Sequence, residues 1–83
     1  MYNVLIVDDD KEIVNAIAIY LKNEGYKIYK AYDGNQAVEK LKEQEIHLII
    51  LDIMMPEKDG IETLEEIRKE KTIPVIMLSA KSE

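Results

Sequence analysis

Residues 48–52 have the sequence Leu-Ile-Ile-Leu-Asp, an unbroken apolar run followed by a carboxylate. Such a run predicts a β-strand buried on both faces, because a strand with one wet face would alternate apolar and polar side chains. Residues 4–7 and 75–78 have the same character, whereas residues 26–31 are more polar and predict a strand at an edge of the sheet. Pro74 can lie only at the beginning of the last strand, since it has no N–H for a ladder hydrogen bond.

Amphipathic segments separate these strands. Apolar residues recur at helical spacing within residues 13–21, 37–41 and 61–67. Gly25 is suited to end the first helix, because helices often end at a residue with a left-handed backbone conformation. The order β-α-β-α-β-α-β predicts an α/β fold with a parallel sheet and right-handed crossovers. We expect one domain over residues 1–83.

Composition limits the classes of function. The 83 residues include no cysteine and one histidine, which argues against a disulfide framework and a thiolate metal site. A net charge of -6 argues against nucleic acid or an anionic membrane as a direct partner. We see no signal peptide and no apolar run long enough to span a membrane, so we expect a cytoplasmic protein.

Polar residues follow the predicted buried strands. Asp8 and Asp9 follow the first, Asp52 the third and Ser79 the fourth. In an open parallel sheet ligands bind beyond the carboxyl ends of the strands, so neighbouring first and third strands would bring these three carboxylates together. Two carboxylates about 4 Å apart repel by about 4 kcal/mol at an effective dielectric near 20, and therefore favour a bound cation. Oxygen ligands suit Mg²⁺ or Mn²⁺, and a carboxylate beside such a metal can act as a nucleophile toward a phosphoryl group.

Three motifs carry a resemblance to a known family. They are Val-Asp-Asp at residues 7–9, Leu-Asp-Ile-Met-Met-Pro-Glu-Lys-Asp-Gly at residues 51–60, and Leu-Ser-Ala-Lys at residues 78–81. In this order they resemble the receiver domains of bacterial two-component response regulators. The likeness is strongest to the OmpR/PhoB-like class, which regulates transcription through a winged-helix DNA-binding output domain. The resemblance implies a flavodoxin-like sheet with strand order 2-1-3-4.

The resemblance also implies a function. A receiver domain is a phosphoprotein of a phosphorelay and not an enzyme in its own right: it takes a phosphoryl group from a sensor histidine kinase onto an aspartate. Asp52 matches this acceptor. The implied Mg²⁺ ligands are Asp9 directly, Asp8 usually through water, Asp52, and the backbone carbonyl of Met54.

Further residues match the groups around the phosphoryl site. Ser79 matches a hydroxyl that binds the phosphoryl group, and the backbone amide of Ala80 matches the donor beside it. Pro56 and Gly60 match the turn that shapes the acceptor loop. The family also uses a lysine at the end of a fifth strand, and Lys81 lies too close to Ser79 to match it.

The family pattern continues beyond Glu83, the last residue here. A fifth strand and the last helices have no counterpart, so the resemblance implies a receiver domain that is incomplete at its C-terminal end. We therefore expect poor phosphorylation of this fragment. We also expect self-association through the apolar edge at residues 75–78, which carries no charge.

Other interpretations of the same residues remain open. Asp9 with Glu12 forms a capping-box pattern, and Asp10 is a candidate cap for the same helix. Asp8 and Asp10 also form the Asp-x-Asp of haloacid-dehalogenase-like phosphatases, with Asp8 as nucleophile. A non-catalytic, self-associating fragment is the third possibility. A dinucleotide-binding domain is excluded, because the first strand-to-helix turn has no glycine.

Two residue types have plain structural explanations. We expect His47 to be a solvated residue at the entrance to a strand. We expect Met54, Met55 and Met77 to serve packing, not cofactor binding.

Overall fold

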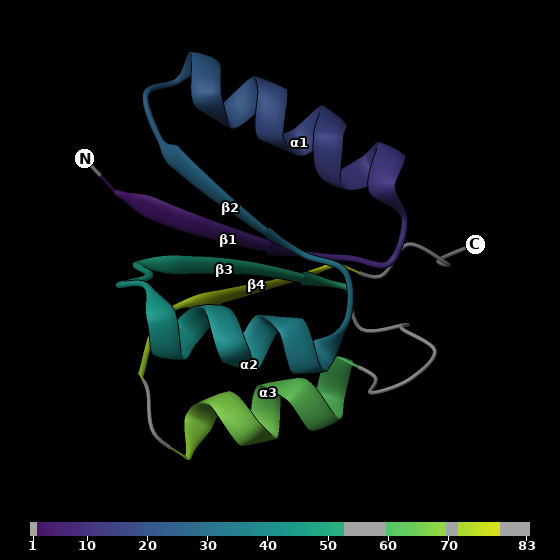
Figure 1. Ribbon diagram of the computed structural model, residues 1–83, viewed down its shortest axis with the longest axis vertical. Coiled ribbons are helices and arrows are strands. Elements are labelled where there is room, and N and C mark those ends of the chain that lie inside the picture. Colours follow the sequence, from purple (N-terminus) through teal and green to yellow (C-terminus); the bar gives the residue numbers. More distant parts are fainter. Residues whose placement is uncertain (1, 53–59, 70–71, 79–83) are drawn as a thin grey trace.

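A computed structural model describes residues 2–52, 60–69 and 72–78. Strands and helices alternate along the chain, as predicted (Figure 1). The strands are β1 (Asn3–Val7), β2 (Lys27–Ala31), β3 (Leu48–Asp52) and β4 (Val75–Leu78). The helices are α1 (Lys11–Asn23), α2 (Gly34–Glu43) and α3 (Gly60–Arg68).

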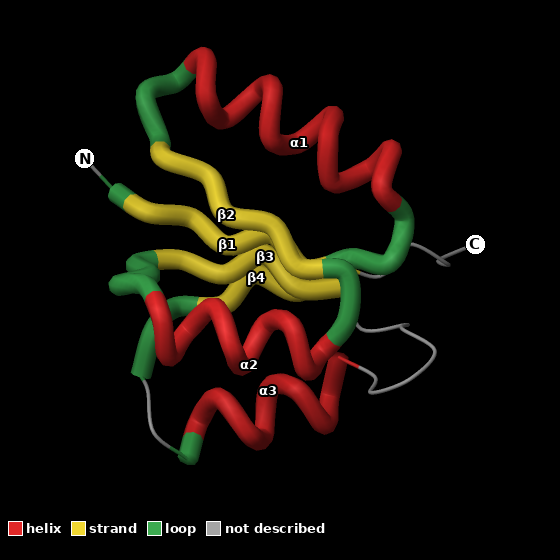
Figure 2. Tube along the Cα trace, viewed as in Figure 1, coloured by secondary structure: helices red, strands yellow, loops and turns green. Residues whose placement is uncertain are grey.

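The four strands form one parallel sheet in the order β2-β1-β3-β4 (Figure 2). This confirms both the α/β class and the predicted order 2-1-3-4. In the register Val7 pairs with Ala31 of β2 on one side and with Leu51 of β3 on the other. The central strands β1 and β3 therefore end side by side, with the polar β2 at one edge and β4 at the other.

Helices cover the two faces of the sheet, with α1 on one face and α2 and α3 on the other (Figure 1). Val4 and Ile6 of β1 pack in a core cluster with Val14 and Ala18 of α1. Leu5 and Val7, which point the opposite way along the same strand, belong to the cluster on the α2–α3 face. The unbroken apolar run of β1 is thus explained by burial on both faces, as the sequence predicts.

The ends of α1 are set by local residues. The side chain of Asp10 accepts hydrogen bonds from the backbone N–H groups of Glu12 (2.9 Å) and Ile13 (3.4 Å), so Asp10 caps the helix and Asp9 does not. Gly25 has φ +96° just past the C-terminal end, a left-handed conformation that glycine adopts without a steric penalty. Both positions agree with the predicted helix boundaries.

At β4, the prediction for Pro74 is confirmed. The Ile49 N–H donates to the Pro74 carbonyl (3.0 Å), so Pro74 takes part in pairing through its acceptor alone. Met77 is 37% exposed, more than the predicted packing role suggests, because its strand is an outer strand of the sheet in the described part of the chain.

His47 is less exposed than the sequence predicts, and its ring takes part in a hydrogen bond. It lies immediately before β3, as expected, but its ring is half-buried and accepts a hydrogen bond from the Asn3 backbone N–H (2.9 Å). The difference arises because β1 and β3 are neighbours, which places two residues 44 positions apart in contact.

Among the described residues, no helix combines the length and the apolar character that a membrane crossing requires.

Candidate functional site

Three carboxylates gather where β1 and β3 end. Asp8 directly follows Val7, and Asp52 directly follows Leu51, the register partner of Val7. One carboxylate oxygen from each of Asp8, Asp9 and Asp52 lies within 4.8 Å of the other two. We call these three residues the acidic cluster. It confirms that the predicted residues converge, although they come from positions more than 40 residues apart.

The members of the acidic cluster differ in exposure. Asp8 and Asp52 are each 2% exposed, whereas Asp9 is exposed. Two carboxylates therefore lie inside the carboxyl edge of the sheet, and the third lies at its rim, open to solvent.

Burial raises the pKa of Asp8 from its ordinary value of 3.8 to about 6. The negative charge and hydrogen bonding of Asp52 act in the same direction, and so does the hydrogen bonding of Asp9. A hydrogen bond from the Asp10 backbone N–H to Oδ1 of Asp8 (3.0 Å) opposes the rise. The cluster thus resists full ionisation as long as no cation compensates its charge.

Asp10 has a separate task from its neighbours. Its carboxylate caps α1, while its backbone N–H supports the Asp8 carboxylate. This division leaves Asp8 and Asp9 available for a ligand. Three consecutive aspartates in the sequence are therefore one cap and two members of the cluster.

The donor set fits a hard divalent cation. Each member of the acidic cluster offers a carboxylate oxygen, the ligand type that Mg²⁺ prefers. A cation bound there would also favour the ionised form of Asp8, whose pKa is raised first by burial and further by the charge of Asp52. Asp8, Asp9 and Asp52 could hold such an ion and leave positions for water or an anion.

Several predicted site residues lie outside the described part of the chain. They are Met54, Pro56, Ser79 and Ala80, and the same holds for Met55 and Lys81. Gly60 is the first residue of α3.

One contact near the cluster was not predicted. The Lys11 ammonium lies 5.5 Å from the centroid of the Tyr32 ring, where α1 begins and β2 has just ended. Lys11 is the first residue of α1 and Tyr32 directly follows β2, so a cation and an aromatic ring lie at the same edge of the sheet as the aspartates. In the sequence, the only indication of this cation–π contact is that Lys11 directly follows the candidate helix cap Asp10.

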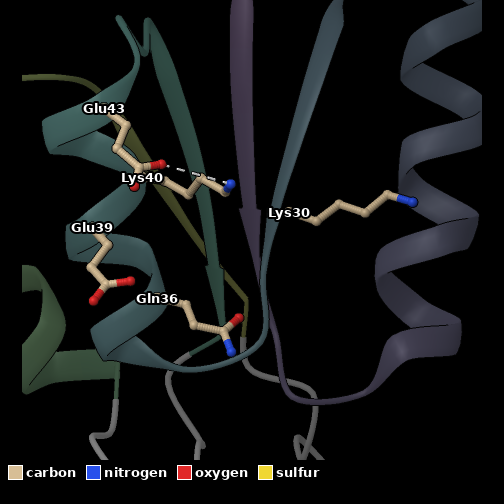
Figure 3. Close-up of a pocket in the computed structure, with 5 residues that line it drawn as sticks. All are labelled: Lys30, Gln36, Glu39, Lys40 and Glu43. Atoms are coloured by element: carbon tan, nitrogen blue, oxygen red, sulfur yellow. Dashed lines mark ion pairs between the residues drawn. The ribbon is translucent and has the colours of Figure 1, made fainter.

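A cavity of about 350 Å³ lies elsewhere, between β2 and α2 (Figure 3). Its lining includes Lys40 and Glu43, which form an ion pair at 4.0 Å. The Lys30 side chain extends away from the cavity toward α1 and donates to Oδ1 of Asn15 (3.0 Å). No member of the acidic cluster lines this cavity, and three of its four charged residues already have partners, so the acidic cluster remains the candidate site.

Comparisons with known proteins agree with this arrangement. A family model described as the response regulator receiver domain matches residues 4–83. The chain belongs to this family, whose members are signalling modules of two-component systems.

The chain is also similar to solved structures of response regulators and their receiver domains. The N-terminal domain of a response regulator receiver protein from Methanoculleus marisnigri is 40% identical, with a TM-score of 0.93 over 100% of this chain and 70% of that one. The response regulator TrrA from Thermotoga maritima, in complex with Mg²⁺ and beryllium fluoride, is 40% identical, with a TM-score of 0.92 over 99% of this chain and 72% of that one. The chemotaxis protein CheY4 of Vibrio cholerae is 31% identical, with a TM-score of 0.94 over 100% of this chain and 72% of that one.

Proposed function

We propose that this receiver domain, spanning residues 1–83, accepts a phosphoryl group on Asp52 from a sensor histidine kinase. The observation that carries the proposal is the acidic cluster, in which Asp52 is buried between two strands with Asp8 and Asp9 within 4.8 Å. Asp52 ends the central strand β3, so its carboxylate is held by the sheet and not by a loop. An oxygen of Asp52 would attack phosphorus while the bond from phosphorus to the donor nitrogen of the kinase breaks.

Mg²⁺ is the proposed cofactor, with Mn²⁺ as a substitute. Asp8, Asp9 and Asp52 would hold it, and the backbone carbonyl of Met54 would complete the protein ligands. When bound, the ion supplies positive charge that offsets the carboxylates and the incoming phosphoryl group. The magnesium in the structure of the Thermotoga maritima relative supports a metal in this family.

The residues of the chain have distinct tasks in this proposal. Asp52 forms the new bond, and Asp8 and Asp9 hold the metal. Ser79 and the backbone amide of Ala80 are proposed to bind the phosphoryl oxygens, by analogy with the family motif. The Asp10 N–H, which donates to Asp8 at 3.0 Å, keeps one oxygen of Asp8 directed into the cluster.

The test identifies the aspartate that becomes phosphorylated. The chain is incubated with acetyl phosphate and Mg²⁺, and the acyl phosphate is located by mass spectrometry after trapping. Asp52→Asn should abolish the label. Asp33→Asn is the matched control, since asparagine caps a helix as well as aspartate does and Asp33 caps α2 far along the chain. A label that moves to Asp8 would contradict the proposal and favour the phosphatase alternative.

The wider role is proposed from the motifs. We infer a winged-helix output of the OmpR/PhoB-like class, a role in transcription regulation, and a cytoplasmic location. The net charge of -6 supports a domain that does not itself contact nucleic acid or a membrane.

A second property, self-association through β4, is favoured by one observation. Ile76 is 51% exposed and Met77 37% exposed on a strand with no charged side chain. The opposite edge, β2, carries Lys27 and Lys30, which discourage pairing with another strand. We propose that a second copy of the chain covers the β4 edge.

A further inference from the structure

His47 and Asn3 form a contact at the amino edge of the sheet, the end where the strands begin. The His47 backbone N–H donates to the Asn3 carbonyl (2.8 Å), and the Asn3 backbone N–H donates to Nδ1 of His47 (2.9 Å). The Asn3 side chain also donates to the carbonyl of Glu45 (2.6 Å). Three hydrogen bonds thus join the first residue of β1 to the segment that leads into β3. Figure 1 shows these two strand starts side by side, opposite the end where Asp8 and Asp52 lie.

The bond to Nδ1 depends on the charge of the ring. A neutral imidazole can accept at Nδ1 only if its proton is on Nε2. A protonated ring has an N–H at both nitrogens, so Nδ1 would then face the Asn3 N–H with a second donor. This hydrogen bond is lost on protonation, whatever the pH at which protonation occurs.

Two groups of the described residues lie against the imidazole. The carboxylate of Glu45 is 3.6 Å from Nε2 and is exposed, so water weakens its attraction for the charged ring. The Tyr2 ring packs edge to face, with ring centroids 5.5 Å apart and an interplanar angle of 84°. Neither group can replace Nδ1 as the acceptor for the Asn3 N–H, because Glu45 faces the other nitrogen and the tyrosine packs through its ring.

We propose that the Asn3–His47 contact is a proton-sensitive clamp on the starts of β1 and β3, which loosens when His47 becomes charged because it loses the hydrogen bond to Nδ1 and keeps the other two. The clamp is independent of the proposed phosphoryl chemistry, since it lies at the opposite end of the same strands.

Nuclear magnetic resonance on the isotope-labelled chain tests the clamp between pH 8 and pH 5. At pH 8 the His47 ring should show the Nε2–H tautomer. On acidification the Asn3 amide proton should move upfield together with the ring titration, and its protection against exchange should fall about tenfold. A ring with its proton on Nδ1 at pH 8, or an Asn3 amide that does not change while the ring titrates, would overturn the proposal.

A neutral variant separates this effect from the titration of Asp8, whose pKa is about 6. His47→Asn places an amide oxygen near the position of Nδ1 and does not titrate, so its Asn3 amide should be the same at pH 5 and pH 8. His47→Gln is a second neutral variant if the first does not fold. In Glu45→Gln, the clamp should loosen at lower pH, because the charged ring has lost a neighbouring carboxylate. An acid-induced change at Asn3 that persists in the neutral variants would assign it to another group and overturn the clamp.

Discussion

Asp8 and Asp52 follow the two members of one register pair, Val7 and Leu51, so that two carboxylates, each 2% exposed, end neighbouring parallel strands. Burial raises the pKa of Asp8 to about 6, and the charge of the neighbouring Asp52 adds to the rise. A proton on Asp8 or a cation bound at the acidic cluster therefore favours the folded state.

Mg²⁺ should stabilise the fold through Asp9. At a metal concentration of 100 times the dissociation constant, binding to the folded state alone adds about 2.7 kcal/mol to the free energy of unfolding. Thermal melts with Mg²⁺ and with a chelator measure this increment, which Asp9→Ala should largely remove. Asp33→Asn should retain it in full. An unchanged increment in Asp9→Ala would exclude Asp9 as a ligand.

Stability without metal should fall as the pH rises through the titration of Asp8. The folded-state pKa, about 6, lies above the ordinary value of 3.8, so the folded state binds the proton more tightly than the unfolded state. This contribution is fully present below about pH 3.8 and is lost as the pH rises through 6, at a cost of about 3 kcal/mol.

Urea unfolding between pH 4 and pH 7.5 in a chelator measures this dependence, with His47→Asn as the background so that the histidine does not contribute. Asp8→Asn should flatten the decline and make the chain more stable at pH 7. Saturating Mg²⁺ should also flatten it, because the metal favours the ionised cluster. A decline of the same size in Asp8→Asn would assign the titration to a different carboxylate.

Asp10 should matter for stability and not for metal binding. Its carboxylate accepts from the N–H groups of Glu12 and Ile13, and replacing such a cap with alanine typically costs about 1 kcal/mol. Asp10→Ala should therefore lower the free energy of unfolding by about that amount, whereas Asp10→Asn should be nearly neutral. Magnesium titration of Asp10→Asn should give the affinity of the unchanged chain; a tenfold loss would show that this carboxylate also takes part in the site.

The β4 edge should control self-association. Ile76→Lys adds a charge to this edge, so light scattering at several concentrations should show a shift toward monomer. Ile19→Lys is the matched control, because Ile19 is also an exposed isoleucine but lies on α1, away from the edge. A monomeric unchanged chain, or an equal effect of both substitutions, would contradict pairing through β4.

Much of the fold follows from short-range patterns in the sequence. The apolar runs at residues 4–7, 48–51 and 75–78 predict strands, and each lies in a strand of the sheet. Burial on both faces is correct for β1 and largely for β3 but wrong for β4, where Ile76 is 51% exposed, because β4 is an outer strand among the described residues. Helical spacing predicts α1, α2 and α3, and the aspartates after the first and third strands predict the acidic cluster. These inferences succeed because burial and backbone hydrogen bonding act on each segment through its own side chains.

The tertiary structure alone decides which groups meet and how deeply they are buried. Of the two aspartates that directly follow β1, it buries Asp8 and leaves Asp9 exposed at the rim. It also brings Asn3 to His47 across 44 residues, where the sequence predicts a solvated histidine. Both outcomes depend on the register and order of the strands, because that register, and not the local sequence, determines the distance between residues far apart in the chain.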